Sequence, residues 1–215
     1  MTEKLHWHTT TESVRKILPE LMEISELKQF RLVGGTALSL QLGHRQSVDI
    51  DLFTDSEYGA VDFRKIDAVL RKIYCCVDTN SALENVPVMM YFIGKTSEAL
   101  IKLDLFYTDP FIFQAVGTDG IRMATMAETG TMKLELISRG GRKKDFWDIL
   151  EISDHMPFLD LVSLSLQKYP YLTKKALKKG LKDFSLADDE VNPRCLRGRY
   201  WELVKADMVE LADQI

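Results

Sequence analysis

The sequence predicts an α+β protein, in which a mixed β-sheet with flanking helices is followed by a C-terminal helical domain. Short apolar runs bounded by glycine or proline, typical of strands, fall in the first half of the chain. Helical periodicity dominates beyond about Ala124. We therefore expect an N-terminal domain with an N-terminal helix at 1–125 and a helical domain at 126–215.

The N-terminal segments lead into a glycine turn. Thr9 and Glu12 have capping-box spacing, which predicts a helix from about 10 to 24. A strand at 30–33 then enters a Gly-Gly turn, and a short helix at 36–42 ends at the following glycine.

The remaining elements follow from the same signals. Asp62 is a candidate N-cap for a helix that runs to Tyr74. The strands expected in this half are 48–53, 75–78, 88–93 and 101–107. The helices expected in the second half are 126–138, 143–153, 158–167, 173–184 and 199–213.

Composition excludes several classes of protein. Of the 215 residues, 46% are hydrophobic and 28% charged, close to average globular usage. No uncharged apolar stretch approaches the length of a membrane span, and the N-terminus lacks the layout of a signal peptide. Three cysteines without a CxxC pair predict no disulfide framework and favour a cytoplasmic location. The net charge of -4 argues against a chain that is basic all over.

Two carboxylates share one face of the strand predicted at 48–53. Side chains two residues apart point to the same side, so Val48, Ile50 and Leu52 are expected in the core, with Asp49 and Asp51 opposite. Carboxylates held so close repel each other unless a cation compensates. Carboxylate oxygen is a ligand that Mg²⁺ prefers.

A third carboxylate lies in the strand predicted at 101–107. Ile101, Leu103 and Leu105 alternate as core residues and leave Asp104 on the opposite face. If this strand pairs beside the strand at 48–53, three carboxylates converge, which is the minimum protein set for a two-metal centre.

The turn at Gly34 and Gly35 complements these carboxylates. Backbone N–H groups at a helix N-terminus attract an anion, glycine lets a phosphate approach closely, and the Thr36 hydroxyl is a further candidate donor. The turn would hold the phosphates of a magnesium–triphosphate, and the aspartates would hold its metal ions. A Gly-Gly turn alone also fits a simple tight turn, and DxD occurs in glycosyltransferases and calcium loops; the combination favours nucleotide chemistry. No GK[ST] follows, so this is not a Walker A loop.

The stretch GGTALSLQLGHRQSVDIDLF resembles the AbiEii toxin family of type IV toxin–antitoxin and abortive-infection systems, within the nucleotidyltransferase superfamily of DNA polymerase β. The segment Met132–Ile149 is similar to that family's K…R…KDxxD motif. The resemblance extends over roughly Phe30–Met208. It implies a polymerase-β-like fold. Within it, the phosphate-binding turn would be Gly34, Gly35 and Thr36, and the metal-binding pair would be Asp49 and Asp51. Asp104 as the third carboxylate rests on strand alternation instead.

The second motif implies further site residues. Lys133 matches the family's lysine, which implies contact with the triphosphate, and Asp145 and Asp148 match its KDxxD aspartates. Which of these two aspartates faces the active site stays open. Arg45 either reaches the phosphates or caps the short helix before it.

The implied reaction is nucleotidyl transfer with two Mg²⁺ ions and a nucleoside triphosphate (NTP) as substrate. The resemblance implies tRNA or another RNA end as acceptor, growth arrest as the consequence of a toxin's activity, and a separately encoded antitoxin as partner. A lysine stripe at 174–182 fits an RNA backbone or a solvated helix face. Two alternatives stay open: an enzyme that adenylylates protein hydroxyls, and a non-catalytic interaction module.

Overall fold

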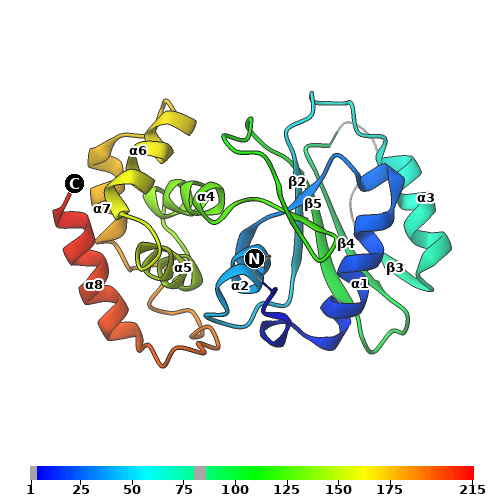
Figure 1. The fold of residues 1–215 in the computed structure, drawn as a ribbon, viewed down its shortest axis with the longest axis horizontal. Coiled ribbons are helices and arrows are strands. Elements are labelled where there is room, and N and C mark those ends of the chain that lie inside the picture. Colours follow the sequence, from blue (N-terminus) through cyan, green and yellow to red (C-terminus); the bar gives the residue numbers. More distant parts are fainter. Residues whose placement is uncertain (1–3, 80–85) are drawn as a thin grey trace. The chain divides into compact units, whose positions relative to one another are not determined.

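The computed structural model describes residues 4–79 and 86–215, and Figure 1 shows its helices and strands. Residues 1–3 and 80–85, which the predicted first domain includes, lie outside the described residues. The chain divides into two compact units. The first comprises Met1–Gln41 and Ser47–Ala124, and the second comprises Leu42–Gln46 and Thr125–Ile215.

The first unit is built on a mixed sheet. Its strands, in the described part of the chain, are β1 (Arg31–Leu32), β2 (Ile50–Thr54), β3 (Cys76–Asp78), β4 (Val88–Gly94), β5 (Ile101–Tyr107), β6 (Val116–Thr118) and β7 (Ile121–Met123). They form one seven-stranded sheet in the order β3-β4-β5-β2-β1-β7-β6. The β2–β5 and β1–β7 pairs are parallel and the other pairs antiparallel. The predicted α+β fold class is confirmed.

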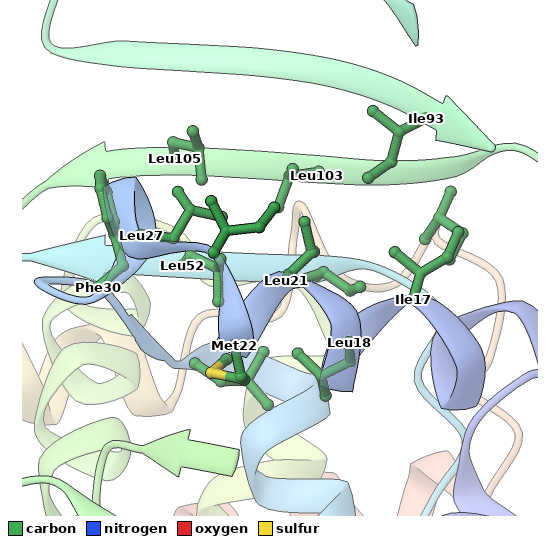
Figure 2. Packing of buried hydrophobic residues seen from close by; sticks show 14 of the residues in the cluster. Ile17, Leu18, Leu21, Met22, Leu27, Phe30, Leu52, Ile93, Leu103 and Leu105 are labelled. Atoms are coloured by element: carbon green, nitrogen blue, oxygen red, sulfur yellow. The ribbon is translucent and has the colours of Figure 1, made fainter. Parts of the chain in front are cut away.

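The helices of this unit cover the sheet. They are α1 (Glu12–Glu23), α2 (Gly34–Leu42) and α3 (Phe63–Ile73), with 3₁₀ turns η1 (Trp7–Thr9) and η2 (Ser25–Leu27). Helices α1 and α3 lie on the same face of the sheet (Figure 1). Figure 2 shows Leu21 of α1 near Leu52 of β2 and Leu103 of β5, all of them buried in one core cluster. Burying such side chains contributes about 1.5–3 kcal/mol each, so this core fixes which face of β2 and β5 stays polar.

Of the two helix starts predicted from N-cap signals in this unit, one is wrong and one is confirmed. The predicted capping box of Thr9 and Glu12 is wrong: Thr11 is the N-cap of α1, and its side chain accepts a hydrogen bond from the Val14 N–H. Thr9 instead lies in η1, where its hydroxyl donates to the His6 carbonyl. The predicted N-cap of α3, Asp62, is confirmed.

Two further differences concern strands. Val48 is 50% exposed and precedes β2, so its predicted core position is wrong. The β6–β7 hairpin was not predicted, although its turn carries the Asp-Gly pair that favours a two-residue hairpin. Asp119 and Gly120 have φ values of 53° and 79°, as such a turn requires.

The second unit is helical, as predicted. Its helices are α4 (Met126–Ser138), α5 (Lys143–Ser153), α6 (Phe158–Lys168), α7 (Lys174–Leu181) and α8 (Trp201–Asp213). Trp147 of α5 stacks on Trp201 of α8 with ring centroids 5.4 Å apart, and Phe146 and Phe184 pack edge-on or tilted around them. Among the described residues, no helix combines the length and apolarity needed to cross a membrane.

Candidate active site

Two of the three predicted carboxylates are neighbours across the sheet. Asp51 of β2 and Asp104 of β5 are register partners in the parallel pair, so their side chains stand on the same face. Leu52, Leu103 and Leu105 point to the other face, toward α1 (Figure 2). The expected pairing of these strands is confirmed, and burial of the alternating leucines is what orients the carboxylates.

The glycine turn lies directly against Asp51. The Val33 N–H donates to the Asp51 carbonyl at 2.9 Å. Gly34 has a φ of 67°, and a Cβ there would lie 2.8 Å from Asp51 Oδ2. Glycine is therefore required at this position both for the backbone conformation and for the space that the carboxylate occupies. The N-terminus of α2 is thus in contact with the carboxylate of Asp51, a side chain of the kind that binds metal ions.

Thr36 connects Asp49 to the start of α2. Its buried hydroxyl donates to the Asp49 carbonyl and lies 2.9 Å from Ser47 Oγ. The hydroxyl was expected to face a phosphate, and the structure gives it this internal contact instead. Asp49 precedes β2, and its side chain is partly exposed. Thr36 therefore fixes the backbone of Asp49 close to the glycine turn.

Asp104 is buried but incompletely satisfied. It is 6% exposed, its Oδ2 forms an ion pair with Lys102 Nζ, and its Oδ1 has no hydrogen-bond partner. An orphaned carboxylate oxygen beside a second carboxylate fits a cation ligand. No three acidic, histidine or cysteine side chains of the described residues are grouped tightly enough to hold a metal ion, so the two-metal centre stays a prediction.

The sequence analysis missed Lys102. Its spacing of two residues from Asp104 in a strand places both side chains on one face, and this was the available signal. The ammonium supplies a compensating positive charge to the buried carboxylate.

The family-motif residues form a second cluster, within the helical unit. Asp148 is fully buried and accepts hydrogen bonds from Arg45 Nε at 2.6 Å and Nη2 at 2.7 Å, and from His44 Nε2 at 2.7 Å. Lys133 Nζ lies 2.8 Å from Asp148 Oδ2 and 2.6 Å from Asp145 Oδ1. Asp145 also accepts the Arg142 N–H at the start of α5.

The charges of this cluster balance. Burial alone would raise the pKa of Asp148, but the attraction of Arg45 and Lys133 and the hydrogen bonds with Arg45 and His44 hold this pKa well below its usual value. Burial alone would lower the pKa of Lys133, and the attraction of Asp148 and Asp145 raises it instead. Both shifts favour the charged forms of Asp148 and Lys133.

This arrangement bears on the predicted roles. Lys133 is 4% exposed and Arg45 3%, and the contacts above engage both side chains with carboxylates. Their contact with phosphate stays a prediction. Both Asp145 and Asp148 face Lys133, with Asp148 at the centre. His44 was missed by the sequence analysis, because no local pattern links it to a residue about a hundred positions later.

The comparisons with known proteins agree with this fold. The family model described as "Nucleotidyl transferase AbiEii toxin, Type IV TA system" matches residues 16–211. The chain belongs to the AbiEii nucleotidyltransferase toxin family. An uncharacterised protein of Aquifex aeolicus (strain VF5) is 29% identical over 201 residues, which are 89% of this chain and 90% of the relative.

One solved structure of low identity shares the fold, and two others match with lower TM-scores. An antigenic nucleotidyltransferase-like protein from Paracoccidioides brasiliensis matches with a TM-score of 0.51 and 16% identity, over 83% of this chain and 98% of that one. The nucleotidyltransferase toxin MenT4 from Mycobacterium tuberculosis H37Rv has a TM-score of 0.48 and 13% identity, over 93% and 84%. The Megavirus polyadenylate synthase has a TM-score of 0.43 and 17% identity over 74% of this chain, which spans 32% of the synthase chain.

Proposed function

We propose that this protein transfers a nucleoside monophosphate from an NTP to the hydroxyl of an RNA end, as in tRNA, and acts as the toxin of a type IV toxin–antitoxin pair. Family membership supports nucleotidyl transfer. The observation that carries the proposal is the contact between the α2 N-terminus at Gly34 and the carboxylate of Asp51, whose register partner is Asp104.

Two of the three proposed ligands suit a magnesium ion as they stand. Asp51 and Asp104 would hold Mg²⁺, because Asp104 Oδ1 is orphaned and Gly34 leaves Asp51 Oδ2 the space that a side chain would fill. Asp49 would have to approach them to complete the set, since no three such side chains of the described residues are grouped closely enough to hold a metal ion. When bound, Mg²⁺ supplies charge neutralisation on the phosphates and a lower pKa for the acceptor hydroxyl.

The chain's own groups have distinct tasks in this proposal. Backbone N–H groups at Gly35 and Thr36 would bind phosphate oxygens at the positive end of α2. Asp104 would also help to take the proton of the acceptor hydroxyl. The acceptor oxygen forms a bond to the α-phosphorus, the bond between that phosphorus and the bridging oxygen breaks, and pyrophosphate leaves.

An RNA acceptor is supported by the surface of α7. Lys174, Lys175 and Lys179 are exposed on this helix, and Leu177 and Leu181 are buried on its other side. A row of exposed lysines suits the phosphates of an RNA backbone. A separately encoded antitoxin is the partner that the family description supports.

Label transfer tests the proposal. The protein would be incubated with Mg²⁺ and each of the four α-labelled NTPs, with and without total tRNA, and Asp49→Ala would be the control. We expect label on tRNA that is absent from the control. Label on protein instead would favour an adenylylating enzyme, and no label with tRNA or protein acceptors would contradict the proposal.

A further inference from the structure

A pair of aromatic rings lies beside the carboxylates on the same face of the sheet. Phe53 follows Asp51 by two residues on β2, Phe106 follows Asp104 by two on β5, and the two phenylalanines are register partners. Their ring centroids are 5.0 Å apart with planes tilted by 37°. Both side chains are partly exposed. The aromatic pair therefore forms the row of the sheet next to the carboxylate row.

A cation extends this aromatic row. Arg31 of β1 is the register partner of Phe53 on its other side. Its guanidinium lies 3.7 Å from the centroid of the Phe111 ring, and its Nη1 donates to the Phe113 carbonyl at 2.8 Å. These contacts hold the guanidinium in place. Aromatic rings beside arginine are the groups that stack on the bases of single-stranded nucleic acids.

The core does not account for the aromatic row. The apolar side chains that bury the sheet against α1 lie on the other face, where Leu52, Leu103 and Leu105 pack (Figure 2). The face that carries Phe53 and Phe106 also carries carboxylates and Lys102. Two adjacent phenylalanines that stay partly exposed beside charged groups present ring surface that a ligand can cover.

We propose that Phe53 and Phe106, with Arg31 at their side, form the subsite on which a nucleobase stacks during the reaction. This inference rests on the proposed function. Two residues along a strand span about 7 Å, a separation that a ribose and one phosphate bridge. A nucleotide whose phosphates lie at Gly34 and Asp51 therefore places its base over the aromatic row. The base belongs either to the incoming NTP or to the end of the acceptor RNA.

The first experiment compares ligands with and without a base. Thermal unfolding of the full chain would be followed in Mg²⁺ with NTP and, separately, with inorganic tripolyphosphate. The variants are Phe53→Leu and Phe106→Leu, which keep apolar bulk without a ring. We expect these variants to bind tripolyphosphate as the wild type does and to bind NTP about 5- to 150-fold more weakly, the range measured for base–aromatic stacking.

Two further variants serve as controls. Phe106→Tyr keeps the ring and should restore NTP binding. Phe92→Leu removes a 46% exposed phenylalanine that is the register partner of Lys102, on the other side of the carboxylates, and should leave the affinity unchanged.

A second arm identifies the source of the base. Binding of tRNA would be compared with binding of the same tRNA carrying an abasic 3′ terminal nucleotide. If the leucine variants weaken binding of the intact tRNA but not of the abasic tRNA or of NTP, the stacked base is that of the acceptor. If they bind both NTP and intact tRNA as the wild type does, the subsite is overturned while the proposed function stands. If the wild type binds none of these ligands, the proposed function falls and the subsite with it.

Discussion

The two units hold their carboxylates in opposite ways. In the sheet unit, Asp51 and Asp104 face each other across β2 and β5, and Asp104 keeps an orphaned oxygen. In the helical unit, Asp148 and Asp145 are matched by Lys133 and Arg45. A carboxylate with an unsatisfied oxygen can take a cation from solution, whereas a charge-balanced buried network has no need of one.

The comparison separates two kinds of motif residue. On the proposed function, the DxD carboxylates bind a ligand, whereas the KDxxD aspartates are engaged in ion pairs within the helical unit. In this unit, Asp148 attaches the segment Leu42–Gln46 to α4 and α5 through Arg45 and His44. The predictions below test whether the two clusters differ as this reasoning requires.

Removing a sheet carboxylate should have the largest effect on activity. Asp51→Ala is expected to lower nucleotidyl transfer by roughly 10³-fold or more, because the lost metal interaction contributes several kcal/mol. The fold should stay intact, since the carboxylate is partly exposed. Label transfer and circular dichroism measure the two quantities. An unfolded variant would make Asp51 a structural residue.

Removing a charge from the helical cluster should instead affect stability. Lys133→Met is expected to lower the free energy of unfolding by about 3–5 kcal/mol, because it leaves buried carboxylates uncompensated. Urea denaturation gives this value. The double variant Lys133→Met/Asp145→Asn restores the charge balance and should lose less than the single variant. If Lys133→Met keeps full stability and loses NTP binding, the lysine contacts phosphate, as the family resemblance implies.

The sequence predicted the carboxylate face because alternation decides which side chains of a strand are buried. Ile50, Leu52, Leu103 and Leu105 orient Asp51 and Asp104 whatever the strand order. The same reasoning failed at Val48, since the strand begins only at Ile50.

Contacts between distant segments were beyond local patterns. Arg45 and Asp148 are separated by more than a hundred residues, and only the packing of α5 against the segment after α2 brings them together. The Thr36 hydroxyl was likewise assigned to phosphate because its bond to the Asp49 carbonyl depends on a tertiary contact.

The helical cluster should also give a characteristic acid response. The pKa of Asp148 is depressed in the folded state, so its stabilisation is present above the ordinary aspartate value of 3.8 and is lost as the pH falls toward the folded value. The unfolding free energy should therefore decline below about pH 4. Asp148→Asn should lower the stability at pH 7 and flatten this decline. An unchanged acid limb in the variant would mean that other carboxylates dominate.

Lys102 offers the smallest and most specific test of the contrast. Its ammonium pairs with Asp104 Oδ2 and so occupies an oxygen that would be open to the proposed metal ion. Lys102→Met should let Mg²⁺ bind several-fold more tightly, because two neighbouring cations repel each other by about 1 kcal/mol or more near a protein surface. The measurement is the Mg²⁺ concentration at half-maximal thermal stabilisation, with Lys95→Met as control, since Lys95 pairs with Glu20 elsewhere in the same unit. Weaker Mg²⁺ binding in Lys102→Met would show that the ammonium supports the site rather than competes with the ion. In that case the sheet carboxylates, like Asp145 and Asp148 of the helical cluster, would depend on a neighbouring cationic side chain, despite the orphaned oxygen of Asp104.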